Sequence, residues 1–139
     1  MTSLQGFLLV VAVVHAGFMI LEMFPWPFPI LLKIVSKGLP DLAREPNERN
    51  ERKWSRHQQP LVATIVHNAG IYNGILAGGL FWAALALAPT LAAGPGREVA
   101  RLLLAGAMVA GIFGTATLKS PATAVQAVLG MIGLVWLGG

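Results

Sequence analysis

Four long apolar stretches, separated by prolines or groups of polar residues, dominate the pattern of this chain. Each is at least 17 residues long, the shortest length at which a helix crosses the ~30 Å hydrocarbon core of a bilayer. Pro25 and Pro89 follow the first two stretches, and Pro121 suits the first position of the last helix. The pattern therefore predicts four membrane-spanning helices, over residues 4–24, 61–88, 97–118 and 121–137.

The lengths of the connections predict how these helices are arranged. Residues 89–96 and 119–120 make short turns, and short turns force neighbouring helices to run antiparallel. The first connection is longer and contains a polar segment over residues 37–60. We expect an all-α fold in which residues 1–139 form a single transmembrane domain, an integral membrane four-helix antiparallel bundle.

Composition supports the membrane class and excludes several functions. Of the 139 residues 55% are apolar and only 12% are charged, and the mean hydropathy is +0.68. Seven basic and four acidic residues lie between Lys33 and Arg56, so the net charge of +4 belongs mainly to one connection. Basic residues that flank apolar spans indicate contact with the lipid bilayer rather than with nucleic acid. The chain has no cysteine, which excludes thiol chemistry and disulfides.

The positive-inside rule predicts the orientation of the bundle. Eight Lys and Arg residues lie on the side of the first and third connections, and only Arg97 and Arg101 lie on the other side. We therefore expect a multi-pass protein of the cell inner (plasma) membrane, with the long connection in the cytoplasm and both termini outside. The N-terminal stretch lacks the basic start of a signal peptide, so we interpret it as a retained helix.

Two ionisable residues in the first predicted helix are the main candidates for chemistry. His15 and Glu22 are seven residues apart, which is two helical turns, so both lie on one face of the helix. A carboxylate within hydrocarbon costs at least ~2.5 kcal/mol, so such residues are usually functional. We predict both as catalytic acid–base groups. The alternatives are an interfacial Glu22 paired with Lys33 or Lys37, and a structural His15 bonded across helices.

The other predicted helices place polar side chains at the same, cytoplasmic depth. Tyr72 is the third predicted catalytic residue. Interhelical hydrogen bonding is the competing interpretation for the three amide side chains in this set. The predicted substrate-binding residues are Asn68, Asn73, Gln126 and Trp82.

A doubled GxxxG pattern gives the second predicted helix a packing face. Gly70, Gly74 and Gly78 would let another backbone approach closely, within the bundle or in a homo-oligomer. A metal site would require His15, Glu22 and His67 to converge. We expect neither a metal nor a cofactor.

Three motifs resemble a family of small four-helix bacterial membrane proteins catalogued as the domain of unknown function thirteen-zero-four. The motifs are H-x6-E-M-F-x-W from His15 to Trp26, N-x-G-x-Y-N-G-x-L-A-x-G-x-x-W from Asn68 to Trp82, and A-G-x-x-G-x-x-T from Ala110 to Thr117. The resemblance implies a four-helix integral membrane fold and no established activity.

These features favour a protein that binds a small lipophilic molecule in a cytoplasm-facing polar pocket. Acid–base groups without a cofactor would suit epoxide opening, isomerisation or cyclisation, as in an isomerase, cyclase or epoxide hydrolase. One alternative is an accessory or structural subunit of a membrane complex. Another is a proton-coupled exporter, although transport favours a site near the midplane and Glu22 lies near one surface.

Overall fold

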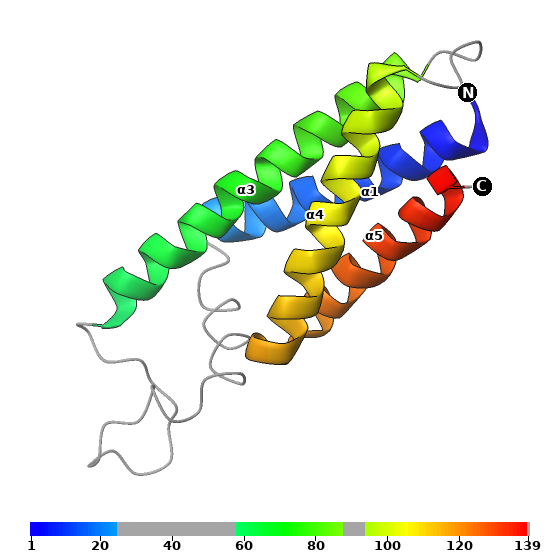
Figure 1. Cartoon of the computed structure of the whole chain (residues 1–139). Coiled ribbons are helices and arrows are strands. Elements are labelled where there is room, and N and C mark those ends of the chain that lie inside the picture. Colours follow the sequence, from blue (N-terminus) through cyan, green and yellow to red (C-terminus); the bar gives the residue numbers. More distant parts are fainter. Residues whose placement is uncertain (25–57, 88–93, 139) are drawn as a thin grey trace.

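The computed structural model describes residues 1–24, 58–87 and 94–138, and all its regular structure is helical (Figure 1). No strand occurs in these three ranges, so the predicted all-α class is confirmed. Most of the predicted charged connection lies outside the described residues, but its last three residues belong to a helix that begins earlier than expected. The helices are α1 (Ser3–Met23), α3 (Gln58–Ala86), α4 (Pro95–Leu118) and α5 (Pro121–Gly138).

Local sequence signals explain where these helices begin and end. A capping box starts α1: Thr2 Oγ1 accepts from the Gln5 backbone N–H (3.2 Å), and Gln5 Oε1 accepts from the Thr2 N–H (2.7 Å). Pro95 begins α4, with Glu98 in its first turn, where the helix dipole favours an anion. The helix ends at Lys119, which adopts a left-handed backbone conformation with φ of 50°. This residue turns the chain so that α5 returns beside α4.

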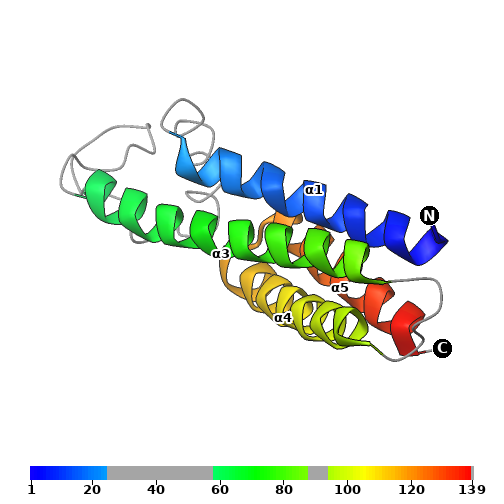
Figure 2. The same ribbon diagram turned by 90° about the horizontal axis from the view of Figure 1, so that it is seen from above.

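The helices form two closely packed pairs, α1 with α3 and α4 with α5 (Figure 1). Seen from above, α1 and α3 lie side by side, and both chain termini lie at the same end of the bundle (Figure 2). The α3 and α4 helices meet near this end and diverge toward the opposite end (Figure 1). The two pairs are therefore held together mainly at one end.

The apolar core lies at the end that holds the chain termini. It draws on the first half of α1, the last turns of α3, the first turns of α4 and the end of α5. Its fully or almost fully buried members are Leu8, Val11, Ala12, Leu80, Ala83, Ala84, Ala100, Leu104 and Leu137. The core thus joins the two helix pairs where α3 and α4 meet.

Glycines allow α4 and α5 to pack backbone against backbone. A Cβ at Gly130 would lie 2.7 Å from both the Leu104 carbonyl oxygen and the Met108 nitrogen. A Cβ at Gly111 would overlap the backbone of Ala127. Because backbone atoms cannot move aside like a flexible side chain, these two positions require glycine. The pairing follows the small-residue rule for membrane helices.

All four helices satisfy the requirements for crossing a membrane. The apolar spans are 18 to 24 residues long, with mean hydropathies between 1.4 and 2.2. Large apolar side chains also cover the outside of the bundle, among them Val13 (70% exposed), Leu102 (72%) and Val135 (72%). A soluble domain rarely exposes apolar groups on this scale. The chain is therefore a multi-pass membrane protein.

Candidate functional site

The last turn of α1 and the first half of α3 meet through a hydrogen bond between two predicted site residues. Asn73 Nδ2 donates to Glu22 Oε2 at 2.7 Å, in a partly buried position. No cation lies against the Glu22 carboxyl among the residues that the structure describes. An amide thus stabilises this carboxyl across the α1–α3 interface, as interhelical polar groups do in membranes.

Two of the predicted packing glycines bring α3 close enough for this contact. A Cβ at Gly70 would lie 2.8 Å from Met23 Cγ and 3.1 Å from Glu22 Cβ, and a Cβ at Gly74 would lie 2.8 Å from Met19 Sδ. The α3 backbone therefore lies directly on the side chains of α1. Asn73, between the two glycines, is close enough to reach Glu22 with its short side chain.

His15 lies two turns nearer the N-terminus of α1 and is completely buried. Its Nδ1 is 2.9 Å from the Val11 carbonyl oxygen, and its ring meets Phe18 edge-on at 6.0 Å. Nε2 is buried and has no hydrogen-bond partner in the described part of the chain. Buried polar atoms nearly always have a partner, so this nitrogen requires an explanation.

The α4–α5 pair contributes buried polar groups toward the same end of the bundle. Gln126 is 9% exposed and Ser120 is 7% exposed. Thr115 Oγ1 donates to the Gly111 carbonyl (2.7 Å) and lies 3.2 Å from Thr123 Oγ1. His15, Glu22, Asn73 and Gln126 are thus partly or fully buried in the half of the bundle beyond the apolar core, which we call the polar end.

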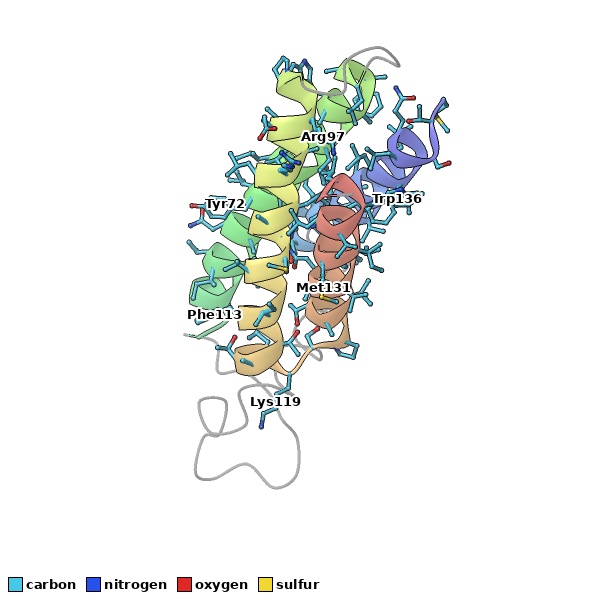
Figure 3. The ribbon with its side chains drawn as sticks, turned by 45° about the vertical axis from the view of Figure 1, so that its right-hand side comes forward. Tyr72, Arg97, Phe113, Lys119, Met131 and Trp136 are labelled. Carbon is cyan, nitrogen blue, oxygen red and sulfur yellow. The ribbon has the colours of Figure 1, made fainter. Side chains whose placement is uncertain are left out.

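The remaining predicted site residues of α3 lie on its exposed surface. Tyr72 is 67% exposed and points away from the bundle (Figure 3). Trp82 is 49% exposed, and Asn68 is exposed too. A helix turns about 100° per residue, so Tyr72 and Asn68 each lie about 200° around α3 from Gly70. Because α1 covers the Gly70 face, the structure does not place these side chains with His15 and Glu22.

Two of the three glycines in the ladder pack within this chain, whereas the packing role of Gly78 stays a prediction. Among the described residues, no atom of another helix lies within 4 Å of a Cβ built at Gly78, which is exposed. Each step of four residues advances about 40° around a helix, so the third glycine rotates away from α1. Gly79 packs instead, against Leu103 of α4. Within this chain α1 covers Gly70 and Gly74, and a homo-oligomer through the glycine ladder stays a prediction.

A protein-family model described as "Protein of unknown function (DUF1304)" matches residues 9–137, which include every candidate site residue. The chain belongs to the DUF1304 family. The predicted family is therefore confirmed, and the family description assigns no activity. No curated protein and no solved structure matches the chain significantly.

The described helices of this DUF1304 chain bring no metal-binding cluster together. No group of three His, Cys, Asp or Glu side chains that could hold a metal ion occurs within residues 1–24, 58–87 and 94–138. His67 is exposed, whereas His15 is fully buried. A metal site would need His15, His67 and Glu22 to lie close together, and the described residues do not bring them together.

The sequence interpretation missed three polar residues at the opposite end of this DUF1304 chain. Gln5 Nε2 donates to the carbonyls of Ala84 (3.1 Å), in the last turn of α3, and Leu87 (2.7 Å), which follows it. Arg97 and Arg101 both donate to the Leu137 carbonyl at the end of α5, Arg101 at 3.1 Å. Free carbonyls at helix ends need such donors. The sequence alone could not show these contacts. Each donor lies far along the chain from the carbonyl it binds, and the pairing depends on the register of the antiparallel helices.

Proposed function

We propose that the protein binds a small lipophilic molecule at the polar end, and that Glu22 is the group that contacts its polar part. The hydrogen bond from Asn73 to Glu22 carries this proposal. It holds the carboxyl at the α1–α3 interface within a membrane-spanning helix, where an ionisable group is costly and therefore usually functional. Asn73 engages only Oε2, and a carboxyl group has further lone pairs with which to bind a ligand.

The chemistry that fits this site is proton transfer without a redox cofactor. Glu22 would act as acid or base, and Asn73 would keep the carboxyl in one orientation. Isomerisation, cyclisation and epoxide opening all suit this pair. Tyr72 has no part in the proposal because its side chain is exposed on α3.

The exporter alternative receives less support from the packing. An alternating-access site needs routes to both membrane surfaces. Leu8, Leu80 and Leu104 are fully buried in the core beyond His15, on the side away from Glu22. A polar molecule bound at Glu22 would have to cross that apolar core.

Mass spectrometry of the purified protein tests the binding proposal. Wild type, Glu22→Gln and Glu98→Gln are reconstituted in nanodiscs of one lipid composition, and co-purified lipophiles are quantified. Glu98 is the matched control, because its side chain is 67% exposed in the first turn of α4 and pairs with Arg101. We expect a bound molecule in wild type and Glu98→Gln that falls at least about tenfold in Glu22→Gln, the loss of one charge-assisted contact. Equal recovery in all three, or none in any, would overturn the proposal.

We also propose that the protein lies in the cell inner (plasma) membrane with its polar end facing the cytoplasm. This orientation is supported by the distribution of Lys and Arg along the chain. Because the chain has no cysteine, single cysteines report sidedness directly. Thr2→Cys and Lys119→Cys place exposed thiols at opposite ends of the bundle. An impermeant maleimide should label Thr2→Cys in intact spheroplasts, and Lys119→Cys only after lysis. The reverse pattern would invert the orientation.

A further inference from the structure

The hydrogen bond inside α1 determines which nitrogen of His15 carries the proton. A carbonyl oxygen can only accept, so Nδ1, at 2.9 Å from the Val11 oxygen, must be the N–H donor. A doubly protonated ring would place a cation in a site with 0% exposure and no acidic partner among the described residues. Such a charge is prohibitively costly. His15 is therefore neutral, and its buried Nε2 presents a lone pair that lacks a donor.

A second buried polar side chain lies at a similar depth. His15 comes one turn after Val11 and Ala12 of the apolar core. Gln126 comes one turn before Gly130, which packs against Leu104 of the same core. No described residue donates to or accepts from the Gln126 carboxamide, which is 9% exposed. Both side chains thus lie just beyond the core on its polar side, and among the described residues His15 Nε2 is the buried side-chain polar atom that lacks a partner.

We infer that the lipophilic molecule carries a hydroxyl group in addition to the polar group that contacts Glu22, and that this hydroxyl donates its hydrogen to His15 Nε2. The inference rests on the proposed function and narrows its ligand class to lipophilic alcohols and phenols. An ether or hydrocarbon of the same shape leaves Nε2 without a donor, so it binds about tenfold more weakly.

A pair of probes that differ only in the donor tests this inference. Wild type with 15N-labelled histidine is placed in phosphatidylcholine nanodiscs and titrated with 4-octylphenol and with its methyl ether. The His15 resonances, among those of three histidines, are identified by their loss in His15→Leu. We expect an unprotonated Nε2 whose 15N shift moves in the hydrogen-bonded direction with the phenol and not with the ether. We also expect about tenfold tighter binding of the phenol to wild type, and equal binding of both probes to His15→Leu.

The inference would be overturned by a protonated Nε2 before any probe is added, by equal binding of the two probes to wild type, or by no binding of either. If the 15N shift of Nε2 already has the hydrogen-bonded value before any probe is added and the phenol does not change it, the partner of Nε2 is water. That result would also overturn the inference. The Glu22→Gln variant separates this test from that of the proposed function. If both probes bind wild type equally and both bind Glu22→Gln more weakly, the proposed binding site is supported and the requirement for a hydroxyl group is not. If the 15N shift of Nε2 still responds to the phenol and not to the ether in Glu22→Gln, the hydroxyl site at His15 is supported and Glu22 is not required for binding.

Discussion

The two ends of the bundle use polar side chains in opposite ways. At the end that holds the chain termini, which we call the closed end, Gln5 and Arg101 donate to backbone carbonyls at the ends of α3 and α5. At the polar end, Glu22 is paired with another side chain, Asn73, and His15 keeps an unpartnered nitrogen. Figure 3 shows Arg97 toward one end of the bundle and Lys119 toward the other.

This contrast separates structural polar groups from groups that remain able to bind a ligand. A side chain that caps a helix terminus satisfies carbonyls that have no other protein partner, so replacing it exposes backbone groups. A side chain that bonds to a neighbouring side chain can exchange that contact for a ligand with little effect on the backbone. The polar side chains of the closed end therefore stabilise the fold, and those of the polar end are the candidates for ligand binding.

The largest expected effect is at the core of the closed end. Leu104→Ala removes a fully buried side chain that packs against Gly133 of α5. We expect a loss of about 2 kcal/mol in the free energy of unfolding, at the low end of the range for soluble proteins, because lipid is as apolar as leucine. Unfolding by SDS titration measures the change. Leu102→Ala, on the lipid-facing side of α4 with 72% exposure, is the control and should change stability by less than ~0.5 kcal/mol.

The packing of α4 against α5 should be the next most sensitive feature. Gly111→Ala places a methyl group into the backbone of Ala127, and overpacking of this kind typically costs ~1–3 kcal/mol. Gly106→Ala is the control, since no atom of another described helix lies within 4 Å of a Cβ at Gly106 and alanine is the better helix former. SDS titration should find Gly106→Ala as stable as wild type or more so. Equal destabilisation by both would mean that the close contact with the Ala127 backbone is not what makes Gly111 sensitive.

Removing the imidazole of His15 should increase stability when no ligand is bound. His15→Leu replaces a buried, unpartnered acceptor with an apolar group, and such an unsatisfied atom costs ~1–3 kcal/mol. We expect a gain of about 1 kcal/mol in thermal or SDS unfolding of delipidated protein. A loss of stability would show that His15 already has a structural partner and belongs with the groups of the closed end.

The smallest expected change is at the Glu22 contact. Asn73→Ala removes the amide donor, and interhelical hydrogen bonds in membranes average ~0.6 kcal/mol. Asn68→Ala is the matched control because Asn68 lies on the same helix with an exposed side chain. Its effect should be within ~0.3 kcal/mol of zero, since an exposed side chain has little contact to lose. If both variants lost the same free energy, the Glu22–Asn73 contact would have no special role in stability.

Much of the architecture could be predicted from hydropathy and turn residues. The runs of apolar residues located four helices to within a few residues, and Pro121 starts α5 as predicted. The α4 helix begins at Pro95, which was assigned to the preceding turn. The start of α3 was missed, because residues 58–60 are polar and a helix can extend beyond the apolar segment it carries. For the candidate site, spacing alone placed His15 and Glu22 on one face of α1. It could not show that Tyr72 and Asn68 face away from them, because that depends on which side of α3 receives α1.

The sequence by itself determined the class of protein, the number of spans and the family motifs, because these follow from local hydropathy, backbone propensity and residue order. Only the tertiary structure decided the partner of each polar group: Asn73 for Glu22, helix-end carbonyls for Gln5 and Arg101, and none for His15 Nε2. The reason is geometric. A hydrogen bond depends on the rotation and register of two packed helices to within a few tenths of an ångström, and those are set by close contacts such as Gly70 on Met23 and Gly130 on Leu104.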